Sequence, residues 1–459
     1  MGDNLVSRTH NTTLPAEIFA REMVARLSEE REEPDWMREK RHIAWSLFEE
    51  IPMPASQDEH WRRTNLNTVK WDALRLPESI HPEPAPSPGR LFEELHVALN
   101  PAEHVAGRLV MLNGHVVWHE LQPKVAAQGV LFMDLTAAVH HHPDLVRQHL
   151  MQAVTPGEGK FAALNGALWN GGAFVYIPRD VKVEQPFEIV IGLQGNNTAL
   201  FPRVLIIAEA GASAVVVEEL VAPDHADQAF SAGVSEIITG AGASITYAEL
   251  QRWGEHVFAC NTRRAVQSAH SHVTWNLGYL GGRLSKTFVD SALREDGASC
   301  QVYGIYFVRG RQHIDLDLAV HHVARHTYAD LLIKGAAHER GRAVFRGLIH
   351  IDRVGQQADS YLKNDNLILS KDARIDSIPS LIIDANDVRA SHGATVGHLD
   401  EEHVFYLQSR GIPRALAVRL VTESFFASVL ERIEQEHIRR KLTEAVISKL
   451  ERCGPPKGS

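Results

Sequence analysis

The sequence contains very little cysteine, with only Cys260, Cys300 and Cys453 among its 459 residues. This odd number, without any Cys-x-x-Cys spacing, excludes a disulfide framework. It also excludes a permanent iron–sulfur cluster that is held by thiolates of this chain alone. Sparse cysteines of this kind are typical of a reducing compartment. We therefore expect a cytoplasmic protein.

Long apolar runs and an excess of positive charge are also missing. No uncharged stretch of about 18 apolar residues occurs, and no basic segment leads into an apolar stretch at the amino terminus. We therefore expect neither a membrane span nor export. Lysine and arginine number 47 against 57 aspartates and glutamates, which gives a formal charge of −10. This balance disfavours nucleic acid and anionic membranes as partners.

Common catalytic and nucleotide-binding motifs are absent as well. The sequence has no GxxxxGK[ST] loop, and Gly240 and Gly242 lack the third glycine and the following helix of a dinucleotide-binding motif. Any ATP that the protein uses must therefore be bound by a partner. No GxSxG or HExxH motif occurs either, so serine-hydrolase and zincin activities have no support.

The two ends of the chain have helical patterns. Apolar residues recur at helical spacing over residues 14–53, and residues 108–158 mix short strand patterns with a helical stretch. Five prolines between positions 77 and 88 predict a linker or an exposed loop, because proline resists both helix and sheet. We therefore predict an N-terminal helical and α/β region over residues 1–158.

The middle of the chain has a strand pattern with a weak repeat. A turn of small residues that leads into a strand recurs at Gly211, Gly242, Ala269 and Gly297, at intervals of 27 to 31 residues. Units of this length predict stacked rungs that bury their faces against their neighbours. We therefore predict a mainly β protein whose core, residues 159–397, is a parallel β-helix. A β-sandwich is the alternative.

Residues 398–459 predict a C-terminal helical module. Gly411 ends a short helix, and Pro413 opens the next one. The apolar stripe of that helix continues through later residues at four-residue steps. The short helix contains Phe405 and Tyr406, with Arg410 directly before Gly411, and one apolar stripe of the next helix comprises Val418, Val421, Phe425 and Val429.

Histidine is abundant, with 26 residues, and several histidines are candidates for metal binding. The triplet at 140–142 precedes a proline, so we expect it in an exposed loop at the start of a helix. The pairs His313-x-Asp315 and His350-x-Asp352 would each share one face of a strand. Two such pairs raise the alternative of a non-haem iron oxygenase, which uses two histidines and a carboxylate on a β scaffold.

The densest histidine cluster comprises His313, His321, His322 and His326. His321 or His322 is expected to face inward beside Asp315 or Asp317 on a rung of the β-helix. We favour hydrogen-bonded structural histidines here.

Several segments are similar to the SufB/SufD family of the SUF iron–sulfur cluster assembly system. Residues 311–335 read RQHIDLDLAVHHVARHTYADLLIKG, and residues 391–412 read SHGATVGHLDEEHVFYLQSRGI, which is highly specific to that family. Shorter matches lie at 61–64, 161–165, 342–347, 364–369, 379–383 and 387–388, so the resemblance covers most of the chain. Gly393 stands where the SufB type has glutamate. At this position the chain therefore resembles the SufD branch.

The resemblance implies a right-handed parallel β-helix and a non-enzymatic scaffold in a SufB–SufC–SufD complex. It implies a SufB partner across the β-helix and a SufC ATPase at the C-terminal helices, whose seven residues named above are the expected contacts. ATP would act through SufC, and the participation of a flavin is left open. Alone, the chain is expected to form a homodimer through the surface that would meet SufB.

His392 resembles the SufD histidine at the SufB–SufD interface where the nascent cluster forms. The resemblance therefore makes it the expected ligand of iron or of a transient cluster shared with SufB. Many SufD proteins have a cysteine two residues earlier, but this chain has Ala390, which offers no thiolate. The alternative is a structural histidine at the junction between sheet and helix.

Overall fold

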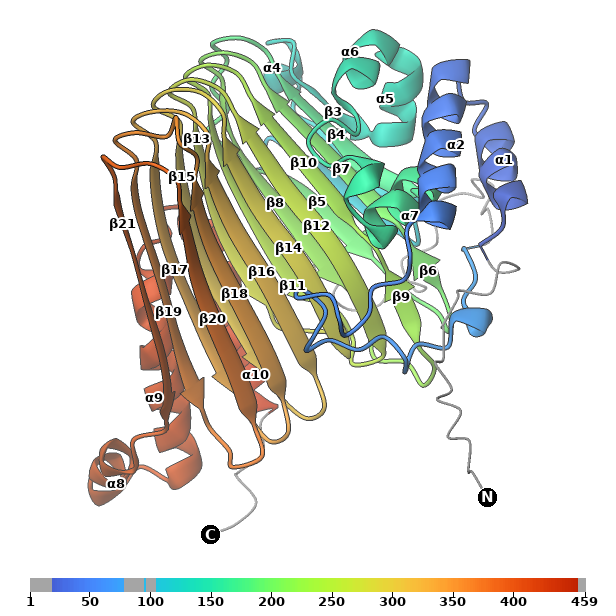
Figure 1. Ribbon diagram of the computed structural model, residues 1–459. Coiled ribbons are helices and arrows are strands. Elements are labelled where there is room, and N and C mark those ends of the chain that lie inside the picture. The colour runs from blue at the N-terminus through green and yellow to red at the C-terminus, as the bar shows by residue number, and fades with distance from the viewer. Residues whose placement is uncertain (1–18, 78–94, 96–104, 453–459) are drawn as a thin grey trace, which may run out of the picture.

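The computed structural model describes residues 19–77, 95 and 105–452 (Figure 1). Most of the predicted proline-rich linker, the first residues of the predicted N-terminal helix and Cys453 lie outside these residues. Within them, no helix is long and apolar enough to cross a membrane.

Two long sheets, built mostly from parallel strands, form a β-solenoid. Sheet one has the order β2 (His115–Leu121), β1 (Gly107–Leu112), β5 (Phe187–Gly192), β8 (Ser213–Val221), β11 (Ser244–Arg252), β13 (His272–Tyr279), β15 (Ser299–Val308), β17 (Tyr328–Ala337), β19 (Asp359–Ile368) and β21 (Arg389–His398). Sheet two has the order β20 (Arg374–Ile383), β18 (Arg342–Ile351), β16 (His313–His322), β14 (Leu284–Leu293), β12 (Val257–Gln267), β10 (Val234–Thr239), β7 (Pro202–Ala208), β4 (Gly171–Ile177) and β3 (Leu131–Asp134), with β6 (Ala199–Leu200) and β9 (Ala229–Ser231) beside β12. The chain alternates between the sheets, so each pair of strands forms one rung.

The weak sequence repeat marks successive rungs of sheet one. The strands that begin at Ser213, Ser244, His272 and Ser299 pair in parallel, and these four residues are aligned in the register. Parallel neighbours exclude the β-sandwich alternative, because sandwich sheets are antiparallel. The prediction of a mainly β protein with a parallel solenoid core is confirmed.

A turn residue with positive φ lies two positions before each of these strands. Glycine occupies the position at Gly211, Gly242 and Gly297, with φ of 69°, 67° and 73°. His270 and His326 take the same place in their rungs, with φ of 54° and 55°. Histidine is one of the residues that tolerate this left-handed conformation. These two histidines therefore belong to the turns.

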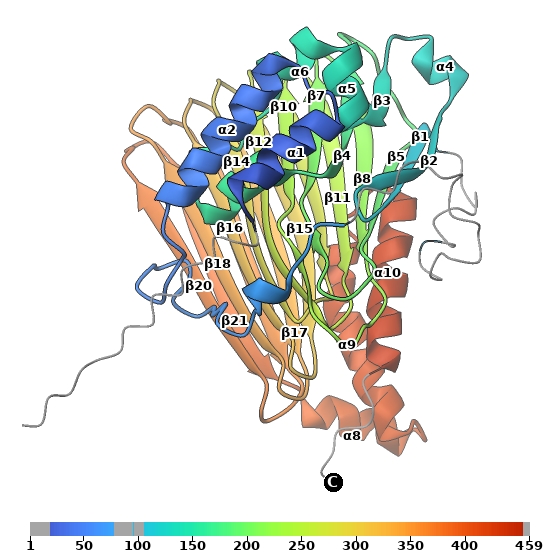
Figure 2. The same cartoon turned by 90° about the vertical axis from the view of Figure 1, so that its right-hand side faces the viewer.

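Helices cover both sheets of the solenoid (Figure 2). The N-terminal helices lie on sheet two and the C-terminal helices α9 and α10 on sheet one, where Phe426 and Leu442 pack with Ile305 and Phe307. The helices are α1 (Arg21–Glu30), α2 (Asp35–Glu50), α4 (Pro123–Ala126), α5 (Leu135–His141), α6 (Pro143–His149), α7 (Lys160–Leu168), α8 (Glu401–Ser409), α9 (Arg414–Leu430) and α10 (Glu436–Glu451), with 3-10 turns η1 (Trp71–Ala73) and η3 (Pro156–Glu158).

Two details of the N-terminal region differ from the sequence interpretation. β1 and β3 lie in the predicted N-terminal α/β region, but they are strands of the solenoid sheets, β1 of sheet one and β3 of sheet two. The predicted exposed loop at residues 140–142 is wrong, because His140 and His141 form the last turn of α5 and His142 ends that helix. The helix start at Pro143 is confirmed.

Candidate functional site

The solenoid is open at its last rung. β20 pairs only with β18 and β21 only with β19 among the described strands, so each has ten residues at a sheet edge. This end lies away from α1 and α2, and no helix of the described residues lies across it (Figure 1). A long, flat edge presents unpaired backbone N–H and C=O groups to another strand. Exposed apolar side chains flank it, with Ile382 47%, Ile383 40% and Val396 46% exposed.

His392 is part of a row of inward-facing side chains in sheet one. Val302, Leu331, Leu362 and His392 are aligned in the register of β15, β17, β19 and β21. Aligned residues of parallel strands point to the same side. The first three are fully buried, whereas His392 is exposed because no further rung covers it. The structure therefore presents this imidazole at the open mouth of the solenoid interior.

The interior beneath this mouth is polar. Asn366 Nδ2 donates to Asn364 Oδ1 at 2.7 Å, and Ser377 Oγ donates to the same oxygen at 2.6 Å. Tyr306 O–H donates to Asn366 Oδ1 from two rungs away. The earlier rungs are filled mainly by aliphatic and aromatic side chains. An ion-paired group around Arg263 is also buried in the interior of an earlier rung, so buried polar groups are not confined to the open end.

Packing does not require the glycine that follows His392. A Cβ atom added at Gly393 would meet only the Tyr361 hydroxyl, at 3.8 Å. Ala390 lies partly buried against the core and offers no ligand atom. His392 itself lies within β21, six residues before the end of that strand, and not at the junction with α8.

The described cysteines are not available as ligands at this end. Cys260 and Cys300 are buried, and burial raises the pKa of both thiols, that of Cys300 to about 12. Neither thiol is a thiolate near neutral pH, and thiolates are the form that binds metals.

The predicted partner contacts on the C-terminal helices differ in exposure. On α8, Phe405 is 73% and Tyr406 57% exposed, and Arg410 stacks on the Tyr406 ring with its guanidinium carbon 5.2 Å from the ring centre. Val418, Val421 and Phe425 on α9 are half-buried. Val429 is fully buried against sheet one, so it holds α9 in place and offers no free surface.

The two His-x-Asp pairs lie in different places. The His313 ring is 3.0 Å from the hydroxyl of Thr64, which also donates to Asp315, and the Thr64 segment crosses sheet two after α2. His350 lies on the next strand and is aligned with His321, eight positions further along than His313. Eight strand residues span about 26 Å. The oxygenase alternative required His313 and His350 to share one site, and the structure shows that they do not.

His322 faces the interior, but not beside Asp315 or Asp317. Its Nδ1 is 2.8 Å from Thr327 Oγ1, and burial lowers the pKa of the ring to about 4. Asp315 and Asp317 instead point outward, where Lys286 forms ion pairs with both. The expectation of an inward histidine beside these aspartates is wrong, but the hydrogen bond to Thr327 does make His322 a structural histidine.

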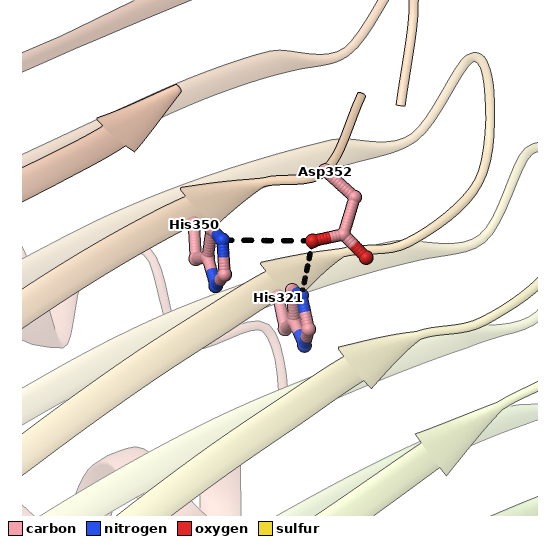
Figure 3. A group of neighbouring side chains, drawn as sticks. All are labelled: His321, His350 and Asp352. Carbon is pink, nitrogen blue, oxygen red and sulfur yellow. Dashed lines mark hydrogen bonds and ion pairs between the residues drawn. The ribbon is translucent and has the colours of Figure 1, made fainter. Parts of the chain in front are cut away.

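His321, His350 and Asp352 come together on the outer face of sheet two (Figure 3). Sequence reasoning paired His350 with Asp352 but missed His321. The sequence spacing could have predicted that His321 lies beside His350, since the two are 29 residues apart. This distance is within the interval of 27 to 31 residues at which the repeat recurs. Residues at that interval on an even solenoid occupy equivalent positions in successive rungs.

Family models match most of the chain. The SufBD core domain of SUF system FeS cluster assembly covers residues 191–425, and the SufBD N-terminal region covers residues 103–189. The chain belongs to the SufBD family. The core match covers β6 to β21 together with α8 and part of α9, so it includes the open rung and His392.

Curated relatives match this SufBD chain over nearly its full length. An iron–sulfur cluster assembly SufBD family protein of Staphylococcus epidermidis is 28% identical over 432 residues, which cover 90% of each chain. The iron–sulfur cluster assembly protein SufB of Bacillus subtilis is 29% identical over 434 residues, which cover 91% of this chain and 90% of that protein. The chain is thus similar both to proteins named only for the family and to one named SufB.

Proposed function

We propose that this SufBD chain is the SufD-type subunit of a SufB–SufC–SufD complex, and that a nascent iron–sulfur cluster forms at its open rung. The observation that carries the proposal is the position of His392, which continues a buried inward row into the uncovered last strand. A scaffold that shares a cluster with a partner needs such a ligand at the surface where the partner docks.

The edge of the last rung suits a partner of the same fold. Ten residues each of β20 and β21 present backbone donors and acceptors in the spacing of a parallel sheet. The last rung of a SufB-type solenoid would continue both sheets. In the absence of SufB, a second copy of this chain would pair through the same edge and form a homodimer.

His392 would supply one nitrogen ligand to iron across this interface. Imidazole binds iron. A single imidazole also releases a completed cluster to an acceptor more readily than a full set of thiolates would. Because Ala390 offers no thiolate, the SufB-type partner would supply the sulfur ligands and a carboxylate. His392 would therefore be the contribution of this chain to the nascent cluster.

The SufD assignment depends on the signature at residues 392–394. A side chain at position 393 would not clash, and it would lie on the outer face of sheet one near the Tyr361 hydroxyl. A glutamate there would add a negative charge to the strand that carries His392. In a SufD-type chain the position is glycine, so the carboxylate would come from the partner.

α8 and the start of α9 form the proposed docking surface for a SufC-type ATPase. Its members are Phe405, Tyr406, Arg410, Leu416 and Leu420, all of which are exposed. α8 begins three residues after the end of β21, the strand that carries His392. Closure of two ATP-bound SufC subunits would therefore pull on an element joined directly to the open rung.

The double variant Phe405→Ala/Tyr406→Ala tests this docking surface. Loss of one aromatic residue at the centre of an interface costs about 2 kcal/mol, or roughly 30-fold in affinity. Because such losses do not simply add, SufC binding by the double variant should weaken by at least roughly 30-fold. Co-purification of SufB and SufC with the tagged full-length chain measures the effect. Both side chains are exposed, so the fold should be unaffected.

Trp118→Ala is the matched control, since Trp118 is 47% exposed on β2, in a different part of the molecule. It should retain SufC. Retention of SufC by the Phe405→Ala/Tyr406→Ala variant at the level of the control would refute the proposed docking surface.

A further inference from the structure

We propose that His321, His350 and Asp352 form a binding site for a divalent transition-metal ion on the outer face of sheet two. This inference is independent of the proposed role of His392, which lies on sheet one. The three residues come from the carboxyl ends of β16 and β18 (Figure 3).

The parallel ladder brings the two imidazoles together. His321 and His350 are aligned in the register of β16 and β18, and their rings stack with centroids 4.4 Å apart and an angle of 7° between the planes. The spacing of neighbouring strands, about 4.8 Å, fixes this separation. The ligand pair is therefore positioned by the backbone, and only small side-chain rotations are needed for binding.

Asp352 completes the group with one carboxylate oxygen. Its Oδ1 is 2.8 Å from His321 Nε2 and 3.5 Å from His350 Nε2, and the ligand atoms of all three residues lie within 4.8 Å of one another. Bonds of about 2.1 Å to one metal ion place neighbouring ligand atoms roughly 3.0 to 3.4 Å apart. The two distances from Asp352 bracket this range, and the two imidazole nitrogens lie within 4.8 Å of each other.

A second carboxylate lies next to the group. Asp384, directly after β20, has its Oδ2 3.8 Å from His350 Nε2, and its side chain is 62% exposed. It is the counterpart of Asp352 in the last rung. The backbone N–H of Asp352 donates to the carbonyl of His322, and that of Asp384 donates to the carbonyl of Ile351. His322 and Ile351 are themselves aligned in the register of β16 and β18. A fourth ligand is thus available after a small side-chain movement.

The ligand types select the class of ion. Two imidazoles with one or two carboxylates suit Fe²⁺, Co²⁺, Ni²⁺ or Zn²⁺, whereas Ca²⁺ and Mg²⁺ prefer oxygen ligands alone and Cu⁺ prefers sulfur. The side chains of His321, His350 and Asp352 are 39%, 30% and 34% exposed. Water or a second molecule can therefore occupy the remaining coordination positions, and the ion can exchange.

Titration of the metal-stripped full-length chain with Co²⁺ tests the site. We expect one equivalent of Co²⁺ to bind and to produce d–d absorption bands of a nitrogen–oxygen site. His321→Ala, His350→Ala and Asp352→Asn should each weaken this binding by at least about tenfold, since loss of even a supporting group costs 10–100-fold. Anaerobic titration with Fe²⁺ should also show tighter binding by the wild type than by each of these three variants.

His326→Asn is the matched control, because His326 is an exposed histidine in the turn after β16 and asparagine tolerates its positive φ. It should bind Co²⁺ like the wild type. Asp352→Asn keeps the side-chain shape, so circular dichroism should confirm that it folds. Absence of stoichiometric binding to the wild type, or equal binding by all four variants, would overturn the site. The docking and cluster experiments test the proposed function separately.

Discussion

His322 has an inward position on β16 and no exposed surface, and its Nε2 has no hydrogen-bond partner. Burial, reinforced by the charge of His321, lowers its pKa to about 4, so the folded protein keeps this ring neutral. In the unfolded chain a histidine has a pKa of about 6.5. Below that pH the unfolded state binds a proton that the folded state does not, so stability is lost as the pH falls from about 6.5 towards 4.

We predict that His322→Leu reduces the acid sensitivity of the protein. Between about pH 7.5 and pH 5, the difference in proton binding at this residue costs the wild type roughly 2 kcal/mol of unfolding free energy. The variant should lose that much less over the same interval. Urea unfolding at the two pH values measures the difference within each protein, so any effect of the lost Thr327 contact at neutral pH cancels.

His326→Asn is again the control for this experiment, since its ring is exposed. It should show the pH dependence of the wild type. If His322→Leu loses as much stability as the control between the two pH values, the ring of His322 is not held neutral by burial.

At the scale of single residues, the sequence identified His392 through its signature but not the direction in which it points. Direction depends on strand register, and a shift by one residue sends every side chain to the other face. Because the register was unknown, the sequence prediction placed His321 or His322 beside Asp315 or Asp317 and did not group His321 with His350. Only the structure sets which of two adjacent histidines is inside.

At the scale of elements, a buried carboxylate ties the segment after α6 to the solenoid. Glu236 on β10 accepts hydrogen bonds from the backbone N–H groups of Met151, Ala153 and Val154 at 2.9 to 3.0 Å. Arg203 on β7 pairs with the same carboxylate at 2.6 Å, and neither side chain is exposed. Glu236 thus ties residues 151–154 to sheet two, in addition to the apolar packing of the N-terminal helices.

We expect Glu236→Ala to destabilise the protein by about 3 to 5 kcal/mol, because Arg203 would remain buried without its counter-charge. Urea unfolding at neutral pH measures the effect. Glu30→Ala is the control, since Glu30 pairs with Arg26 on an exposed face of α1 at 3.5 Å and should cost at most about 0.5 kcal/mol. Equal stability of the two variants would show that the buried pair does not hold this segment.

The elements that the sequence predicted well are those in which a pattern recurs at a regular interval. The rungs beginning at Ser213 and Ser244 and the stripe from Ile438 to Leu450 on α10 are where the pattern placed them. α7 was missed because it is buried on all sides and has no amphipathic stripe. The position of β1 in sheet one depends on pairing with β5, some 80 residues later, which no local pattern reveals.

At the scale of the whole molecule, helices cover both faces of the solenoid but leave its last rung open. The N-terminal helices shield sheet two, and α9 and α10 shield sheet one. The uncovered end has two strand edges, exposed apolar residues and His392. In the proposed function, this arrangement would let a chain without a nucleotide-binding loop or a described thiolate contribute to cluster assembly through partners.

Cluster formation on the reconstituted SufB–SufC–SufD complex tests the central claim most directly. The complex would be supplied anaerobically with iron and sulfide, and the cluster measured by its visible absorption. Because a lost ligand weakens iron binding by about tenfold or more, His392→Ala should leave the complex intact but sharply reduce the cluster yield. His398→Ala, which removes another exposed imidazole from β21, should match the wild type. A wild-type cluster yield from an intact complex carrying His392→Ala would contradict the account.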